Sequence, residues 1–213
     1  MTTTDFFTHC WRNARFRLAL AAFACGLFLG LPPSASAQTA AEVTQLRLER
    51  AADGLYLYAN VKVDLPPAVE DALLKGVPMF FVAEADVVRH RWYWSDKKVA
   101  ATQRHMRLAY QPLTRRWRLN MASGVITANS LGVALNLNFD TLAEAMSALQ
   151  RLSGWKIADA SVLERDATLK VDFRFSLDLA QLPRPFQIGA FGQSDWTISA
   201  SAMQQIGPEN GDK

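Results

Sequence analysis

Alternation of apolar and polar side chains with a period of two is the strongest pattern in the chain. From residue 169 to 179 every odd position is apolar, and every even position between them is polar or charged. Successive side chains of a strand point to opposite faces, so this pattern predicts a strand with one buried and one solvated face. The odd positions are again apolar in 55–63 and in 131–139. Weaker versions of the pattern predict strands near 43–50, 78–94, 103–110, 114–121, 155–162 and 195–200.

Turn-forming residues separate these segments. Asp53-Gly54, Pro112 and Ser123-Gly124 each fall between two predicted strands, and Gly, Pro, Asp and Ser are favoured in tight turns. Many strands with one solvated face indicate antiparallel sheets that pack face to face. The sequence therefore predicts a mainly β chain that forms a single-domain antiparallel β-sandwich, for which an immunoglobulin-like arrangement is one option.

Two short helices are predicted between the strands. The first opens at Pro66-Pro67, where a missing amide hydrogen costs nothing, and ends at Gly76. The second begins with a capping box formed by Thr141 and Glu144, and Gly154 is predicted to end it. Its apolar stripe at helical spacing consists of Leu142, Met146, Leu149 and Leu152.

The N-terminus carries the three parts of a secretory signal. Arg12, Arg15 and Arg17 precede an apolar run from Leu18 to Leu31, and Ala35-Ser36-Ala37 supplies the small side chains that a signal peptidase requires. A membrane-spanning helix usually needs about 20 apolar residues. The run is shorter, which favours a cleaved signal over the alternative of an uncleaved membrane anchor. The sequence predicts a signal peptide at 1–37, a folded domain at 38–206 and a disordered tail at 207–213.

Cleavage of this signal would change the chemistry of the chain. Both cysteines, Cys10 and Cys25, lie in the signal, so the remaining chain has no disulfide and no thiolate ligand. The signal also holds three of the 23 Lys and Arg residues and one of the 20 Asp and Glu residues, which leaves a net charge of about +1. That balance gives no indication of nucleic-acid binding. The signal itself indicates a periplasmic location.

Patterns for catalysis and metal binding are missing from the sequence of the predicted domain. Its two histidines, His90 and His105, form no His-x-His pair, although Glu84 and Asp86 share strand parity with His90. We therefore expect no metal site and no cofactor. The fragment Gly192-Gln193-Ser194-Asp195 lacks the second glycine of a nucleophile elbow. A hydrolase on a β-sandwich scaffold stays an alternative if a histidine meets Glu84 and Asp86 in a cleft.

A basic cluster between Arg89 and Arg118 is the most unusual feature of the sequence. Nine Lys and Arg residues stand in this segment against one acid, Asp96, which gives about +8. Aromatic residues such as Trp117 are interleaved with them. Charge of this density is offset either by carboxylates elsewhere in the fold, such as Glu84 and Asp86, or by an anionic ligand.

Residues 103–110 and 114–121 are predicted to pair as a hairpin across Pro112. Strand parity then places Met106, Leu108 and Tyr110 on one face, together with Trp117, Leu119 and Met121. The basic side chains gather on the other face, where like charges opposite one another repel by roughly 0.2–1 kcal/mol per pair. The candidate ligand-binding or partner-binding residues are Arg104, His105, Arg107, Arg115, Arg116 and Arg118.

Several short motifs follow one another in order along the predicted domain. They are Tyr110-Gln111-Pro112-Leu113-Thr114-Arg115, the strand end Leu177-Asp178, Leu182-Pro183-Arg184-Pro185 and Asp195-Trp196. In these motifs, and over roughly 41–205, the chain resembles a family of exported proteobacterial proteins called domain of unknown function DUF4390. The resemblance implies no established activity and no catalytic residues. It implies an envelope sensor histidine kinase as a partner, because members are often encoded beside such a kinase.

These features together predict a non-catalytic periplasmic module of the cell envelope that binds or interacts with a partner. That partner would be an envelope protein such as a sensor kinase, or an anionic envelope component such as a lipid headgroup or an acidic glycan. The alternatives are an accessory subunit of an envelope sensor histidine kinase, and a hydrolase built on the same scaffold.

Overall fold

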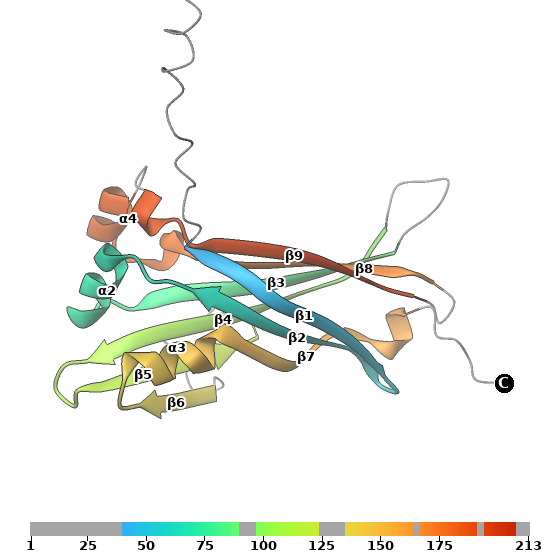
Figure 1. The fold of residues 1–213 in the computed structure, drawn as a ribbon, viewed down its shortest axis with the longest axis horizontal. Helices are drawn as coiled ribbons and strands as arrows, with labels where there is room; N and C mark the ends of the chain where they lie inside the picture. The colour runs from blue at the N-terminus through green and yellow to red at the C-terminus, as the bar shows by residue number, and fades with distance from the viewer. Residues whose placement is uncertain (1–39, 90–96, 124–134, 164–166, 191–193, 208–213) are drawn as a thin grey trace, which may run out of the picture. The chain divides into compact units, whose positions relative to one another are not determined.

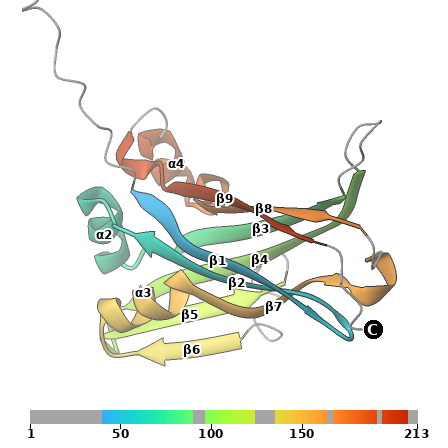
Figure 2. The same ribbon diagram turned by 45° about the vertical axis from the view of Figure 1, so that its right-hand side comes forward.

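The alternating segments form two antiparallel sheets, drawn as arrows in Figures 1 and 2. The computed structural model describes residues 40–89, 97–123, 135–163, 167–190 and 194–207. In these residues the small sheet consists, in order, of β1 (Ala41–Ala51), β2 (Gly54–Val63) and β7 (Arg151–Asp159). The large sheet consists, in order, of β6 (Leu135–Phe139), β5 (Arg116–Ala122), β4 (Lys97–Gln111), β3 (Met79–Arg89), β8 (Leu169–Leu177) and β9 (Ser199–Ile206).

The two sheets enclose one hydrophobic core. The odd residues of β8 point into it, and Phe173 and Phe175 are fully buried there. Leu55 and Leu57 of β2 line the core from the small sheet, while β1 lies beside β9 where the edges of the two sheets meet. The predicted mainly β, antiparallel sandwich is thereby confirmed. The described strands divide three and six between the sheets, whereas an immunoglobulin constant-type domain divides them four and three.

The two predicted helices are present in the described chain, together with a third. In α2 (Pro67–Leu74) the helix starts after Pro66 and gives way to Gly76, whose φ of 85° is a left-handed conformation that favours glycine. The capping box of α3 (Leu142–Gln150) has formed, with the Glu144 amide donating to Thr141 Oγ1 at 3.2 Å. The sequence pattern missed α4 (Arg184–Ala190), because Pro183 and Pro185 look like helix breakers although the start of a helix accepts proline.

Two predicted boundaries are wrong. Gly154 does not end α3, because α3 stops at Gln150 and β7 follows at once from Arg151. The strand predicted at 195–200 starts only at Ser199, since Ser194–Trp196 form the short 3-10 helix η3. Two further 3-10 helices, η1 (Ala160–Val162) and η2 (Leu179–Gln181), follow β7 and β8. Both mark places where the alternating pattern continues beyond the strand itself.

Some sequence predictions fall outside the described residues. These are the signal peptide at 1–37, the strand ends at 90–94 and 131–134, His90 and nearly all of the tail at 207–213. In the part of the chain that the structure describes, no helix is both long enough and apolar enough to span a membrane.

Candidate binding surface on the large sheet

The predicted basic hairpin is formed by β4 and β5. Tyr110 pairs with Trp117, and their rings lie 4.8 Å apart between centroids on the core side of the sheet. Arg107 pairs with Asn120 on the opposite side, which we call the outer face. This register agrees with the division of side chains that strand parity predicts, since a shift by one residue would exchange the two faces.

The structure brings four of the six candidate residues to the outer face. They are His105, Arg107, Arg116 and Arg118. Arg104 has the opposite parity, and its guanidinium carbon lies 5.0 Å from the ring centroid of Trp155 on the small sheet. Burial lowers the pKa of Arg104. Arg104 therefore packs between the sheets, apart from the other candidates.

Arg115 occupies the turn that joins the two strands of the hairpin. Its φ of 53° lies in the left-handed region, the only such non-glycine residue in the described chain. For an L-residue with a Cβ this conformation costs about 1–2 kcal/mol, and glycine or asparagine would adopt it more readily. An exposed, long cationic side chain is therefore held at a position that local conformation disfavours.

Amide side chains from β5 and β6 lie among the arginines. Arg107 Nη1 donates to Asn120 Oδ1 at 3.4 Å, and Arg118 Nε donates to Asn138 Oδ1 at 3.3 Å. Asn120 is 1% exposed and its amide donates to Asn136 Oδ1. We call this set the basic–amide surface; its members are Arg107, Arg116, Arg118, Asn120, Asn136 and Asn138.

In the described part of the chain, carboxylates neutralise only one of the three arginines of the basic–amide surface. Arg116 Nε lies 3.3 Å from Asp140 Oδ1, in an exposed ion pair. Among the described residues, no carboxylate lies within ion-pair distance of Arg107 or Arg118. Burial, and then the charge of Arg118, lower the pKa of Arg107. A guanidinium keeps its charge through such shifts, so Arg107 and Arg118 stay charged on this face without a carboxylate partner among the described residues.

His105 lies on the same face, between these arginines and the acidic residues of β3. It is 6% exposed, and neither ring nitrogen has a hydrogen-bond partner in the described part of the chain. Burial lowers the pKa of His105, while the carboxylates of Asp178 and Glu84 oppose that shift. A neutral ring with no partner cannot act as a base held in place by a second group.

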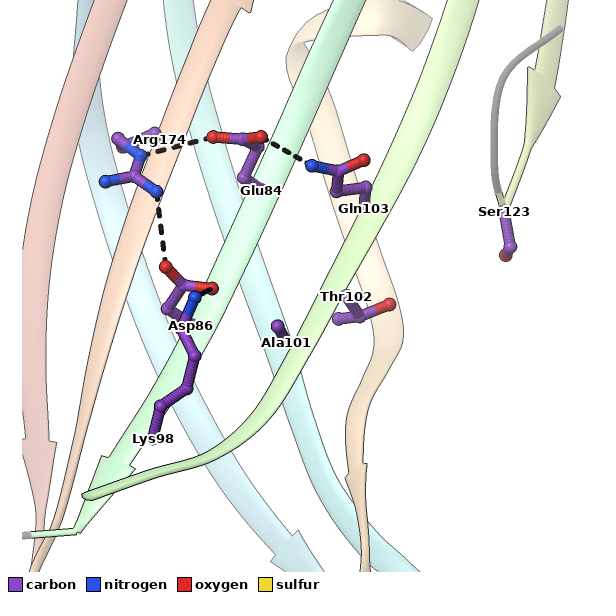
Figure 3. A pocket seen from close by; sticks show the side chains of 8 residues that line it. All are labelled: Glu84, Asp86, Lys98, Ala101, Thr102, Gln103, Ser123 and Arg174. Atoms are coloured by element: carbon purple, nitrogen blue, oxygen red, sulfur yellow. Dashed lines mark hydrogen bonds and ion pairs between the residues drawn. The ribbon is translucent and has the colours of Figure 1, made fainter.

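The outer face along β8, β3 and the first part of β4 contains a hollow of about 450 Å³, shown in Figure 3. Arg174 donates through Nε to Glu84 and through Nη2 to Asp86, both at 3.2 Å. Lys98 Nζ lies 2.8 Å from Asp86, and Gln103 Nε2 donates to Glu84 at 2.6 Å. We call this the charged hollow; it is lined by Glu84, Asp86, Lys98, Ala101, Thr102, Gln103, Ser123 and Arg174.

The charged hollow contains the two carboxylates that the hydrolase alternative requires. They are Glu84 and Asp86, but His105 does not line the hollow. Both carboxylates accept hydrogen bonds from Arg174, and Asp86 also pairs with Lys98. No group of three or more His, Cys, Asp or Glu residues that could hold a metal ion occurs within the described ranges.

Sequence reasoning missed the asparagines and Arg174 as parts of this face. Asn136 and Asn138 occupy alternate positions of a predicted strand, and this repeat was the available indication of an amide ladder. Arg174 stands at a polar position of the strand at 169–179. Its partners could not be named without strand order, because Glu84 is 90 residues away in the chain.

The comparisons with known proteins bear on the whole domain. Residues 38–206, which include every strand described above, match the family described as "Domain of unknown function (DUF4390)". A search of curated proteins and a search of solved structures each gave no significant match. The two sheets and the basic–amide surface are thus features of the matched region, and the chain belongs to the DUF4390 family.

Proposed function

We propose that the protein is a non-catalytic binding module of the cell envelope, and that the basic–amide surface docks against an acidic surface of an envelope protein. The proposal follows from the predicted export signal and from the chemistry of the outer face. A sensor histidine kinase is the partner that the family resemblance suggests. Under this proposal the charged hollow stabilises the sheet and takes no part in catalysis.

One observation supports this proposal above the others. Arg107 and Arg118 lie near each other on one face, and no carboxylate of the described chain pairs with either. The repulsion between them is offset in part by the Asn120 and Asn138 side chains, which accept hydrogen bonds but carry no charge. An acidic partner would supply the missing carboxylates, and pairing at a partly desolvated site is stronger than in open solvent.

The arrangement favours a macromolecular partner over a small ligand. Neither Arg107 nor Arg118 lines the charged hollow, and the basic–amide surface runs across three neighbouring strands. Small molecules bind in concave sites that cover most of their surface. A face built from arginine and asparagine side chains on a sheet is better suited to a broad acidic surface.

The test is charge reversal at Arg116 and Arg118 of this surface and at Arg115 in the adjoining hairpin turn. The tagged full chain is expressed in its host, crosslinked and purified from the envelope with and without Arg115→Glu, Arg116→Glu and Arg118→Glu together. A matched control reverses Lys62, Lys75 and Arg184, which are exposed and lie on other elements. We expect the first variant to lose the crosslinked partner and the control to retain it, with recovery falling as salt concentration rises.

Two results would contradict the proposal. One is a folded variant of the basic–amide surface that still recovers the same partner. The other is equal loss of the partner in the matched control, which would show that net charge and not this face is recognised. Near-ultraviolet circular dichroism of each purified variant establishes that the fold is retained.

Export requires its own test. We expect the protein to be recovered from the periplasmic fraction with an N-terminus near Gln38, as determined by mass spectrometry of the intact protein. Recovery from the cytosol with Met1 in place would contradict an envelope function, whatever the outcome of the crosslinking.

A further inference from the structure

The outer face of the small sheet contains a second hollow, of about 280 Å³. It contains none of the residues proposed above to bind a partner, and it lies on the opposite layer of the sandwich. Arg47 of β1, Tyr58 and Asn60 of β2, and Arg151 and Ser153 of β7 contribute to it. The lining is completed by Gln45, Ala59 and Leu152.

Irregular pairing on both sides of β2 shapes this hollow. The register between β1 and β2 shifts between Val43 and Gln45, beside Asn60. The register between β2 and β7 shifts between Leu57 and Ala59, so that two residues of β7, Ser153 and Gly154, stand opposite Tyr58. Bulges of this kind bend a strand and redirect its side chains, and they are common next to binding sites.

Gly154 is the residue that allows the bulge on β7. Its φ is 56°, and a Cβ added to it would have no atom within 4 Å. The glycine is therefore required by backbone conformation and not by crowding. Since β7 begins at Arg151, this bulge lies two to three residues after the arginine that lines the hollow.

The charges around the second hollow are unlike those of the charged hollow. Of the residues that the structure describes, two arginines line it and no carboxylate does. Arg47 pairs with Glu49, which is outside the lining, at 3.0 Å with both side chains exposed. Such a surface pair contributes about 0–1 kcal/mol and exchanges readily for another anion. Within the described residues Arg151 has no ion-pair partner.

Neutral hydrogen-bonding groups make up much of the remaining lining. Asn60 Nδ2 donates to Gln45 Oε1 at 2.9 Å, and the guanidinium carbon of Arg47 lies 5.1 Å from the ring centroid of Tyr58. Ser153 adds a hydroxyl. Because one water molecule occupies about 30 Å³ in the liquid, a volume of about 280 Å³ exceeds the needs of a lone phosphate ion and suits one sugar ring.

We propose that this hollow binds a sugar unit that carries a negative charge, with Arg151 and Arg47 holding its carboxylate or phosphate. Gln45, Asn60 and Ser153 then contact its hydroxyl groups. The site is independent of the basic–amide surface, so either one can fail in experiment without affecting the other.

The test uses the protein purified from its host after expression of the full chain. Binding of each probe is measured by isothermal titration calorimetry and by changes in amide NMR shifts. The probes are glucuronate, glucose 6-phosphate, glucose and inorganic phosphate. We expect the two charged sugars to bind in the millimolar range with shifts confined to β1, β2 and β7, and glucose and phosphate to bind much more weakly. Whichever of glucuronate and glucose 6-phosphate binds more tightly shows whether the site prefers a carboxylate or a phosphate.

Arg151→Gln is the diagnostic variant, and Lys62→Gln on the same sheet face is its matched control. Arg151 is exposed and lies just after α3, so the variant should keep its melting temperature. We expect Arg151→Gln to weaken the charged sugars at least about tenfold, or about 1.4 kcal/mol, and the control to leave them unchanged. The proposal is overturned by wild-type protein that binds no charged sugar, by inorganic phosphate that binds as well as they do, or by Arg151→Gln that binds them normally.

Discussion

The two halves of the large sheet's outer face use the same residue type in different ways. On β3 and β8, Arg174 is held by the carboxylates of Glu84 and Asp86. On β4, β5 and β6, Arg107 and Arg118 are held by the neutral oxygens of Asn120 and Asn138. Both arrangements give the guanidinium a hydrogen-bond acceptor, but only the first neutralises its charge.

The comparison shows that an arginine side chain can be held in position without having its charge neutralised. An arginine that is paired with a carboxylate of its own chain presents little net charge to a second protein. An amide partner fixes the geometry of the guanidinium and leaves its charge in place, which is the condition for binding an anionic surface. Within the described residues, the same face thus contains one half whose arginine is neutralised and one half in which Arg107 and Arg118 are not.

The largest expected loss of stability comes from a substitution in the half where asparagines hold the arginines. Asn120→Ala removes a side chain that is 1% exposed and that bonds to both Arg107 and Asn136. We expect a loss of about 1–3 kcal/mol in the free energy of unfolding, because buried polar groups are left without partners. Urea denaturation measures it. Asn138→Ala, at an exposed position of the same surface, is the control and should change stability by no more than about 0.5 kcal/mol.

A substitution in the hairpin turn tests whether Arg115 lowers the stability of the fold. Arg115→Gly relieves a φ of 53° that glycine adopts freely, so we expect the free energy of unfolding to rise by about 1 kcal/mol. Thermal melting checks the gain. Under the proposed function the same variant recovers less crosslinked partner, whereas an unchanged recovery would show that Arg115 has no part in docking.

A smaller effect is expected in the carboxylate-held half. A double-mutant cycle of Arg174→Ala and Glu84→Ala should give a coupling of about 0.2–1 kcal/mol, since both side chains are partly exposed. Partner recovery should not change in either variant. A coupling well above this range, or lost recovery, would mean that the two halves do not differ as described.

The pH dependence that comes from His105 is the smallest of these effects near neutrality. Burial lowers the pKa of His105 below its ordinary value of 6.5, so the unfolded chain binds the proton more readily than the folded one. The free energy of unfolding is therefore highest, as far as His105 is concerned, above about pH 6.5. It decreases as the pH falls through 6.5 toward the folded-state pKa. Urea denaturation at several pH values should show that loss. His105→Met should reduce the slope, and an unchanged slope would assign the pH dependence to other groups.

Local sequence was sufficient wherever a pattern depends on neighbours in the chain. The odd residues of 169–177 had to share one face, and the Thr141–Glu144 capping box had to start a helix, because both involve residues a few positions apart. The hairpin of β4 and β5 is likewise a contact between close neighbours. The division of its side chains followed directly from the turn at Pro112.

Gly154 shows where local reading fails. A glycine after an apolar helical stripe resembles a helix end, yet here it serves a bulge inside β7. Both uses require a positive φ, so the residue alone cannot distinguish them. The pairing with β2 decides between them, and that pairing brings residues 57–59 next to residues 152–155.

The sequence by itself determined which side chains lie on each face of a strand, because a strand's side chains alternate whatever lies beside it. It also determined that this domain contains more cations between Arg89 and Arg118 than that segment can neutralise. Only the tertiary structure decided which of them are neutralised. Lys98 meets Asp86 through the pairing of β3 with β4, and Arg107 meets Asn120 through the pairing of β4 with β5. Strand order sets these partners, since ion pairs and hydrogen bonds act over a few ångströms in space and take no account of distance along the chain.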